Sequence, residues 1–545
     1  MTQLNDINRR AFLRLAGGGI TGLLAGSALG ALGLNAVYGQ DTVPSSIDTR
    51  LTTTLTPPDV EIVLRAVPDD IAIFPGAATR VWRYVGEVLQ GDADALQDIP
   101  GSYLGPIFRV RKGQRVRIHF INELPEESIV HWHGLHVSEI MDGHPRFAIA
   151  PGETYVYDFQ VLNRAGTYWY HPHPHGRTGP QVYNGLAGLF LVTDDEEAAL
   201  DLPTGEYDVP LVLQDRTFDA NNQLRYLPNG MMDRMMGFLG ERILVNGQPD
   251  FVLPVATRAY RLRLLNGSNS RVYKLGWEDG TPLTVIGTDG GLLEAPVQRD
   301  YVVLGPAERV DLWVDFGGRP VGAEMRLQSL PFSGAEVGGV MGGGPARAAL
   351  PNGSQFTVLR VRIEREAAVT QALPERLTTI QWPRLEDAIN AASPRVFTIG
   401  MQHMGWTLNG RTFEMEGVAS DEIVRLNTLE VWEFENPVNS RGGGSGMMGT
   451  SMGRGGGMGM VHPIHVHGLQ FQILEREVAS DLAGNWETVR DGHVDEGWKD
   501  VVLLMPGERV RLLLKFEDYT GLFLYHCHNL EHEDMGMMRN YRVEA

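Results

Sequence analysis

The sequence predicts an all-β protein made of several similar β-sandwich domains. Its 545 residues include 65 glycines and 31 prolines, a composition that favours strands and turns over helices. Segments 108–122, 258–277 and 507–516 alternate apolar and polar residues, which is typical of strands that bury one face. We therefore expect strands and tight turns along most of the chain.

One phrase recurs along the chain and indicates repeated domains. "KGQRVRIHF", "GPAERVDLWVDF" and "PGERVRLLLKF" each place a Gly or Pro turn before an alternating strand, and "APGETYVYDF" is a variant. A glycine-rich stretch at 334–354 and a less regular, proline-containing stretch at 367–393 interrupt the pattern. The expected domains are 50–197, 203–365 and 393–545.

The N-terminus resembles a twin-arginine secretion signal. Arg9 and Arg10 precede Phe12 and Leu13, and a weakly apolar Gly/Ala/Leu stretch follows. The alternative is a transmembrane anchor, but the many glycines and small residues favour a signal over residues 1–40 that is removed. We expect a mature protein that is periplasmic or secreted and has no stable membrane anchor.

The net charge and the single cysteine narrow the classes of partner and the kinds of site that the protein can have. A net charge of -20 argues against nucleic acid as a partner, because nucleic-acid binding needs basic patches. The same charge would tolerate or attract a cationic substrate. The single cysteine, Cys527, cannot form an intrachain disulfide, although an extracytoplasmic compartment would permit one. Cys527 is therefore an accident, a reactive thiol or a metal ligand.

Histidines gather in four short clusters. Thirteen of the sixteen histidines lie in "HWHGLHVSEIMDGH", "HPHPH", "HPIHVH" and "HCHNLEH", and each cluster contains an H-x-H pair. Residues i and i+2 of a strand point to the same face, so each pair presents two imidazoles side by side. One such pair is often unrelated to metal binding. Four pairs, two in the first third of the chain and two in the last, predict a metal site with eight imidazoles.

The ligand types favour copper. Imidazole suits zinc, copper, iron and nickel, but a structural zinc site needs only four ligands and often uses several cysteines. A His₂Cys set with a weak axial Met is the blue-copper arrangement, and Cys527, His532 and Met537 provide it with His462 as the second imidazole. If His526–Cys527–His528 is extended, the thiol points away from its two neighbours. Electrons could then cross from the thiolate to an imidazole through one residue of backbone.

With these residues the chain resembles the multicopper oxidases, the family of laccases and cuprous oxidases. The four motifs are "HWHG", "HPHPHG", "HPIHVHG" and "HCHNLEHEDMGMM", in the family's order and with no ligand missing. The resemblance spans most of the mature chain. It implies three cupredoxin-like Greek-key β-sandwich domains. It also implies four copper ions, three of them in a cluster at the interface of the first and last domains.

The resemblance also implies ligands position by position. The type 1 copper would take His462, Cys527, His532 and Met537; the type 2 copper His131 and His465; and the type 3 pair His133, His171, His173, His467, His526 and His528. His136, His144 and His175 match no ligand position and are expected beside the ligands or at the surface. His119, His403 and His493 receive no role. We expect His462 and His532 to be the ligands that lie toward the surface, where a donor docks.

Two carboxylates, Asp142 and Glu533, match the acidic residues that relay protons in the family. Reduction of O₂ to two waters needs four electrons and four protons, so nearby acids have a role in it. The alternative is that Glu533, which follows the ligand His532, orients ligands only.

The sequence specifies the electron donor less clearly than it specifies the copper ligands. Thioethers favour Cu(I), and the glycine-rich loop before His462 contains several methionines that cannot belong to a core: Met447, Met448, Met452, Met458 and Met460. A second group is Met231, Met232, Met235 and Met236, although methionine also fills cores. The family's cuprous oxidases add an aspartate to such a site. Residues 436–461 contain no acidic residue.

We therefore expect a monomer that oxidises Cu(I), for copper tolerance, with O₂ as the acceptor. A laccase that oxidises phenols or aromatic amines is the alternative. A single-domain electron carrier or copper-storage protein would leave eight histidines unexplained, and a copper nitrite reductase lacks a full trinuclear set. A division or scaffold protein that had lost its copper would also have lost ligands.

Overall fold

The computed structural model describes residues 56–335, 350–402, 405–438 and 459–545. Every element below belongs to the unit Pro57–Ala545. The proposed secretion signal, His403 and four loop methionines lie outside the described residues: Met447, Met448, Met452 and Met458. Within the described ranges, no helix is long and apolar enough to cross a membrane.

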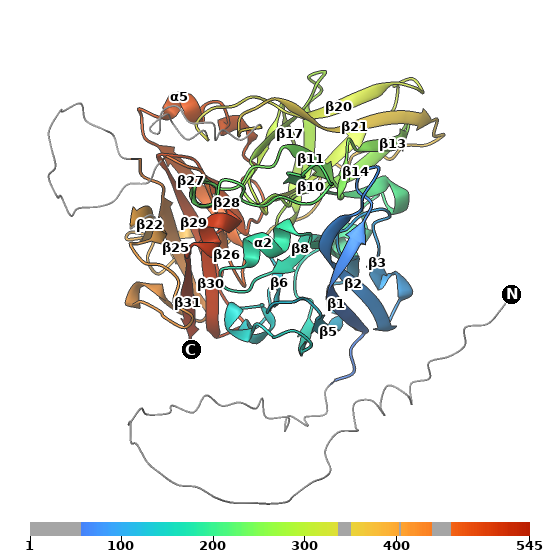
Figure 1. Cartoon of the computed structure of the whole chain (residues 1–545). Coiled ribbons are helices and arrows are strands. Elements are labelled where there is room, and N and C mark those ends of the chain that lie inside the picture. The colour runs from blue at the N-terminus through green and yellow to red at the C-terminus, as the bar shows by residue number, and fades with distance from the viewer. Residues whose placement is uncertain (1–55, 336–349, 403–404, 439–458) are drawn as a thin grey trace, which may run out of the picture. The chain divides into compact units, whose positions relative to one another are not determined.

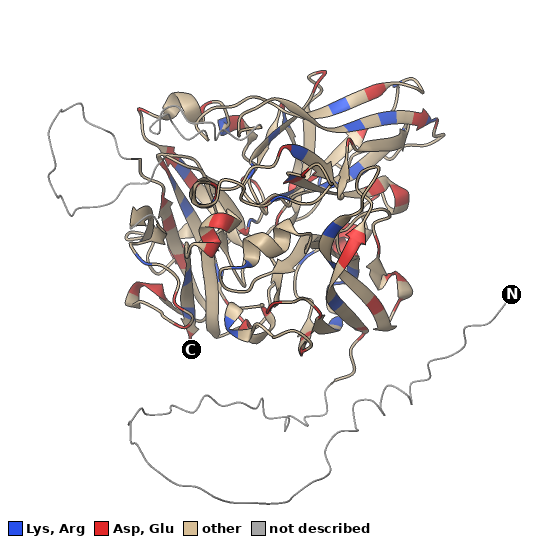
Figure 2. Ribbon diagram, in the orientation of Figure 1, with Lys and Arg blue, Asp and Glu red and all other residues tan. Residues whose placement is uncertain are grey.

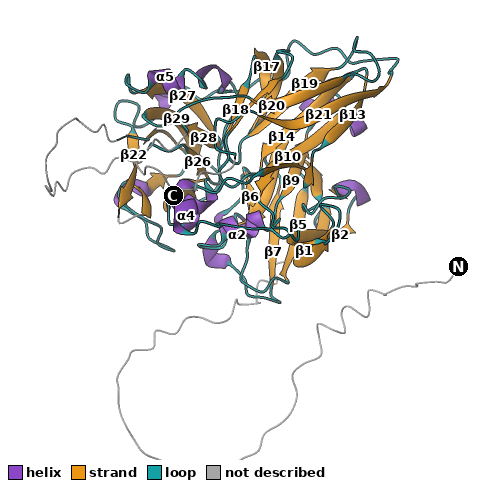
Figure 3. Cartoon of the chain, turned by 45° about the horizontal axis from the view of Figure 1, so that its top comes forward, coloured by secondary structure: helices purple, strands orange, loops and turns teal. Residues whose placement is uncertain are grey.

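Six sheets dominate the described chain, and helices are few and short (Figure 3). The prediction of an all-β fold is thus confirmed. The helices are α2 (Thr178–Tyr183), α3 (Asp195–Ala198), α4 (Met231–Met236), α5 (Ala483–Trp486) and α6 (Leu530–Asp534).

Two sheets come from the first third of the chain. One has the order β2 (Thr79–Gln90), β1 (Val60–Ile71), β5 (Arg115–Asn122) and β7 (Thr154–Gln160). The other has the order β3 (Leu96–Gln97), β4 (Ile107–Arg111), β9 (Gly188–Thr193), β8 (Gly166–Pro172) and β6 (Val130–His133).

Two further sheets come from the middle third. The seven-stranded one has the order β12 (Gln248–Pro249), β11 (Arg242–Val245), β10 (Asp208–Arg216), β14 (Ala259–Asn266), β19 (Arg309–Asp315), β16 (Leu283–Thr288) and β17 (Gly291–Arg299). The other has the order β13 (Val252–Ala256), β21 (Phe356–Arg365), β20 (Glu324–Ser329), β15 (Tyr273–Trp277) and β18 (Val302–Leu304).

The last third also forms two sheets. One has the order β23 (Gly405–Leu408), β22 (Arg395–Gln402), β25 (Thr428–Glu435), β29 (Glu508–Phe516) and β27 (Phe471–Val478). The other has the order β24 (Ile423–Arg425), β31 (Met538–Glu544), β30 (Gly521–Cys527), β26 (His462–Val466) and β28 (Val501–Leu504). Two sheets in each third agree with the three expected domains, whose boundaries stay a prediction.

Of the strands that alternate in sequence, β5 also alternates in burial, whereas β19 is buried on both faces except at Asp315. The three copies of the recurring phrase form β5, β19 and β29, and each has a partner strand on both sides. Every second residue of β5 is buried, because one of its faces meets the core and the other approaches solvent. Figure 2 shows acidic and basic residues interspersed along the strands.

The strands that carry the histidine motifs are buried on both faces. All residues of β6, β8 and β26 are buried, and so are all residues of β30 after Gly521. In Figure 1, β26 and β30 of the last third run beside β6, β8 and α2 of the first. One face of each of these strands therefore packs in the core of its own third of the chain, while the other face packs against the other third.

Candidate metal centre

Alternation along the strands separates the histidines from the residues between them. Trp132, between His131 and His133, packs edge-on against Phe108 at 5.7 Å in the core of the first third. Cys527, between His526 and His528, belongs to the core of the last third. The histidines on either side thus share one face of the strand and the intervening residue takes the other.

Eight imidazoles converge between the first and last thirds. The antiparallel register sets His131 opposite His171 in β6 and β8, and His465 opposite His526 in β26 and β30. All eight side chains are buried: His131, His133, His171, His173, His465, His467, His526 and His528.

Contacts between Nε2 atoms link five of the eight rings in two sets. The Nε2 atoms of His131 and His465 lie 3.3 Å apart. The Nε2 atom of His526 lies 3.0 Å from that of His467 and 3.4 Å from that of His173.

The other three rings are those of His133, His171 and His528. The ring centroid of His528 lies 5.1 Å from that of His133 and 5.2 Å from that of His171. Stacking also joins the sets, because the His131 and His467 centroids lie 3.8 Å apart and so do those of His133 and His465. The contact between His131 and His465 agrees with the expected type 2 pair, and the other six histidines are those expected as type 3 ligands.

Hydrogen bonds to carbonyl oxygens fix which ring nitrogen is free. A carbonyl can only accept, so the Nδ1–H group donates in four of the rings. The acceptors are the carbonyl of Asp142 for His131 (2.6 Å), of Asp500 for His465 (2.7 Å), of Pro172 for His171 (2.9 Å) and of Cys527 for His526 (3.2 Å). Each ring therefore presents an Nε2 lone pair, which is the atom that a metal takes.

Burial favours the neutral form of six of the eight imidazoles. It lowers the pKa of five cluster histidines well below the usual value: His133, His171, His173, His465 and His467. It also lowers the pKa of His528 to about 3. Both nitrogens of His528, and Nε2 of His171, are buried without a hydrogen-bond partner among the described residues. Buried, neutral, unpaired imidazoles are the donors that copper requires, so these residues fit the metal.

A second group lies on the other face of β30. The Cys527 sulfur is 3.5 Å from Nδ1 of His462 and 3.7 Å from Nδ1 of His532. Burial raises the pKa of the Cys527 thiol and lowers that of His532 to about 3. Copper binding would have to displace the thiol proton, because the thiolate is the metal ligand.

The segment after Cys527 folds back on it. The Asn529 side chain caps α6 by accepting from the His532 N–H, which sets His532 at the start of the helix beside Cys527. After α6 the chain returns, and the Cys527 N–H donates to the carbonyl of buried Met537 at 3.0 Å. One capped turn of helix thus brings three of the four predicted type 1 ligands together.

The prediction that His462 and His532 lie toward the surface is wrong. Both side chains are fully buried. Helix α4 of the middle third packs against α6, and the Met235 carbonyl accepts hydrogen bonds from Nε2 of His532 and Nε1 of Trp406, both at 3.1 Å. The helix that covers His532 lies nearly 300 residues earlier in the sequence, so no sequence pattern near His532 indicates that this side chain is buried.

Both predicted relay carboxylates touch the cluster. The Asp142 carboxylate accepts from Nδ1 of His467 at 2.8 Å. The Glu533 carboxylate lies 3.2 Å from Nδ1 of His526 and 3.6 Å from Nε2 of His173. Asp142 and Glu533 are 1% and 2% exposed. Each is thus placed to orient a histidine.

Sequence reasoning missed a third carboxylate, Asp500. Its Oδ1 atom lies 3.2 Å from Nε2 of His133, and its carbonyl is the acceptor for His465. Asp500 precedes β28 in "GWKDVVLL", which contains no H-x-H pair or other predicted ligand. Only the pairing of β28 with β26 brings it to the cluster.

The remaining clustered histidines lie outside these groups. His136 bonds the Gly468 carbonyl and Asp518, His144 bonds Asn540, and the His175 ring lies 4.9 Å from Phe413. Isolated His119 bonds Glu61. These contacts agree with the expectation that they are not ligands.

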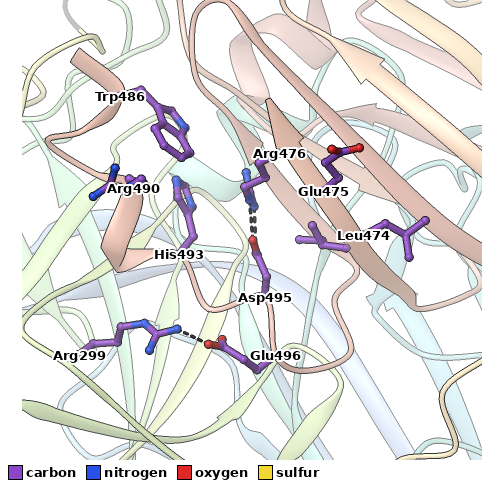
Figure 4. Close-up of a pocket in the computed structure, with 10 residues that line it drawn as sticks. Arg299, Leu474, Glu475, Arg476, Trp486, Arg490, His493, Asp495 and Glu496 are labelled. Atoms are coloured by element: carbon purple, nitrogen blue, oxygen red, sulfur yellow. Dashed lines mark hydrogen bonds and ion pairs between the residues drawn. The ribbon is translucent and has the colours of Figure 1, made fainter. Parts of the chain in front are cut away.

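His493 lines a separate cavity of about 310 Å³, beside Trp486 and Arg476 (Figure 4). Arg476 pairs there with Asp495, and Arg299 pairs with Glu496. None of the predicted ligands lines this cavity.

The described methionines differ in exposure. The expectation that Met460 cannot belong to a core is wrong: Met460 is 4% exposed and packs in the core of the last third, so its thioether does not face solvent. Met231 and Met232 of α4 are 55% and 40% exposed, whereas Met235 is buried. The short helix over His532 therefore presents two methionines outward.

Comparison with known proteins agrees with this geometry. Two family models, both described as multicopper oxidase, match residues 85–197 and 388–545. The multicopper oxidase Mco of Staphylococcus haemolyticus is 30% identical over 446 residues, which are 81% of this chain and 83% of its own. A laccase of Bacillus stratosphericus is 31% identical over 489 residues, 81% of this chain and 89% of its own.

A solved structure extends the likeness to the fold. The crystal structure of the multicopper oxidase McoA from Aquifex aeolicus superposes with a TM-score of 0.72 at 34% identity, over 90% of this chain and 97% of that one. The structural neighbours are cupredoxin-fold proteins. From its motifs, its fold and these relatives, the chain belongs to the multicopper oxidase family.

Proposed function

We propose that this protein binds four copper ions and couples the one-electron oxidation of a donor to the reduction of O₂ to water. The observation that carries the proposal is the burial of eight imidazoles along β6, β8, β26 and β30 or directly after them, with a Cys–His₂ group on the other face of β30. The ligand sets would be His462, Cys527, His532 and Met537 for type 1; His131 and His465 for type 2; and His133, His171, His173, His467, His526 and His528 for type 3.

Copper bound at these residues supplies one-electron oxidation of the donor and four-electron reduction of O₂. The chain supplies the connection and the protons. Cys527 is joined through one peptide group to His526 and through another to His528, which gives a short covalent path between the two groups. Asp142 and Glu533 are proposed to relay protons, since each carboxylate lies beside a cluster histidine and away from solvent.

Cu(I) is the donor that we favour. Helix α4 supports this choice because its Met235 carbonyl contacts His532 while Met231 and Met232 are exposed on the same short helix. Thioethers are soft ligands that select Cu(I). The second candidate is a laccase that oxidises phenols or aromatic amines, which the names of relatives such as the Bacillus laccase favour.

The experiment that tests the donor measures O₂ consumption by the copper-loaded protein with Cu(I) and, separately, with a bulky phenol. Met231→Leu/Met232→Leu removes two thioethers but keeps two apolar side chains, and a second variant lacks residues 442–457. Met415→Leu is the matched control, because Met415 is also 40% exposed. We expect Cu(I) turnover to fall in at least one test variant while phenol turnover holds. Unchanged Cu(I) turnover in both would favour the laccase.

We also propose a periplasmic or secreted monomer that is exported through the twin-arginine pathway. Arg9 and Arg10 support this location. Replacement of both with Lys should leave the protein in the cytoplasm on cell fractionation.

A further inference from the structure

Two aspartates hold the histidine cluster in a mirrored arrangement. The Asp142 carbonyl accepts from His131 at 2.6 Å and its carboxylate from His467 at 2.8 Å. The Asp500 carbonyl accepts from His465 at 2.7 Å, and its carboxylate lies 3.2 Å from Nε2 of His133. Each aspartate thus orients one predicted type 2 ligand through its backbone and one predicted type 3 ligand, from the opposite third, through its side chain.

The two aspartates differ in their cation partners. Asp500 forms a two-pronged pair with Arg309, whose Nη1 and Nη2 atoms each donate to one carboxylate oxygen at 2.6 Å. Both side chains are fully buried. The Asp142 carboxylate has no arginine or lysine partner among the described residues, and its Oδ1 atom makes no hydrogen bond there.

All five N–H groups of Arg309 are used. Besides the two bonds to Asp500, Nε donates to the Thr167 carbonyl at 3.0 Å, Nη1 to the Ala307 carbonyl at 3.1 Å and Nη2 to the Asp289 carbonyl at 3.0 Å. Thr167 lies in β8, the strand that contains His171. Arg309 begins β19 of the middle third. One guanidinium therefore ties β8, the middle third and Asp500 together.

We infer that Arg309 and Asp500 are positioning residues for the copper cluster. Arg309 holds the Asp500 carboxylate in one orientation, and that carboxylate holds His133 by Nε2, which leaves Nδ1 as the free donor atom of this ring. Nδ1 of His133 is buried and unpaired among the described residues. The middle third, which contains no predicted copper ligand, thereby sets the position of one. This inference rests on the proposed copper cluster.

The test is the copper affinity of Arg309→Gln and Arg309→Lys. The Gln substitution removes the ion pair with Asp500. Lys keeps the charge but cannot form the two-pronged bond or use five donors. The matched controls are Arg261→Gln and Arg261→Lys, because Arg261 is buried beside Asp311 at 2.6 Å in the same third and touches no predicted ligand. Each holoprotein is titrated with a copper chelator, and total copper, EPR-silent copper and the blue absorption are recorded.

Loss of a residue that orients a metal ligand weakens metal affinity about 10–100-fold. We expect Arg309→Gln to lose the EPR-silent copper at about 10–100-fold less chelator than the wild type, with Arg309→Lys between the two. The blue absorption should persist in both. The Arg261 variants should keep wild-type affinity.

Equal affinity in the Arg309 and Arg261 variants would overturn the inference. If Arg309→Gln does not fold, Arg309→Lys against Arg261→Lys decides the question in the same way. A wild-type protein that binds no EPR-silent copper would instead refute the proposed function itself.

Discussion

Replacement of Asp142 with Asn separates ligand orientation from proton transfer. The Asp142 side chain makes one hydrogen bond, from Nδ1 of His467 at 2.8 Å. The bond that orients His131 goes to the Asp142 backbone carbonyl, so a side-chain substitution leaves it intact. Asn keeps an oxygen that can accept from His467, but it cannot take up a proton near neutral pH.

The loss of ligand orientation and the loss of proton transfer differ in size. A hydrogen bond to a charged group contributes about 1.5–3 kcal/mol and a neutral one about 1 kcal/mol, so Asn weakens the hold on His467 by about 0.5–2 kcal/mol. That corresponds to about a 2–30-fold loss in copper affinity, which excess copper overcomes. General acid–base catalysis contributes about 10²–10⁴-fold, so loss of the relay should reduce turnover by at least about 100-fold.

The assay is O₂ consumption per bound copper, measured on Asp142→Asn after loading with excess copper. Asp142→Ala is the comparison, because it removes both the acceptor and the acid and should lose copper as well as turnover. A fully loaded Asp142→Asn protein with turnover within about threefold of the wild type would show that Asp142 only orients His467, since a relay residue contributes far more.

Three further outcomes are expected. The copper-loaded protein should be blue, and Cys527→Ser should abolish both the colour and turnover, because serine supplies no thiolate; a variant that still consumed O₂ at the normal rate would contradict the path through Cys527. Gly143→Ala should lower the free energy of unfolding by about 1–3 kcal/mol more than Gly152→Ala. Both glycines have φ of 84°, but only at Gly143 does an added Cβ meet backbone, the Val130 oxygen at 2.2 Å; equal losses in chemical denaturation would refute the clash. Burial lowers the pKa of His493 to about 3, from about 6.5 in the unfolded chain, so the unfolded state binds more protons as pH falls below 6.5. The wild type should thus lose about 2 kcal/mol more stability than His493→Gln between pH 7.5 and pH 5, and parallel pH profiles would contradict this.

The residues that gather in the two buried groups could be predicted from the sequence because their signals are local. H-x-H pairs in strands have a fixed geometry, and the Cys527–His532–Met537 spacing spans one capped helical turn. The recurring turn-and-strand phrase located β5, β19 and β29 for the same reason.

Features that depend on contacts between distant segments could not be read in this way. Asp500 and Arg309 are 191 residues apart, and although Arg309 lies in a copy of the recurring phrase, that phrase indicates a strand and not a contact with Asp500. The burial of His532 depends on Met235, 297 residues earlier. Methionine content alone could not separate Met460, which fills the core, from Met231, which is exposed. A residue's type and spacing indicate its chemistry, but its accessibility depends on the segment that packs over it.

The double burial of β6 and β8 has a consequence for biosynthesis. The face that carries His131 and His171 is covered by the last third, and His465, the contact of His131, follows 334 residues later. At about 5–20 residues per second, the ribosome needs roughly 17–67 s to make that stretch. During this interval the histidine-bearing face of the nascent sheet has no segment to pack against, and its unligated imidazoles can bind other metal ions. A chaperone that shields this sheet, or metal supply only after release, would keep the early intermediate from closing around the wrong ion.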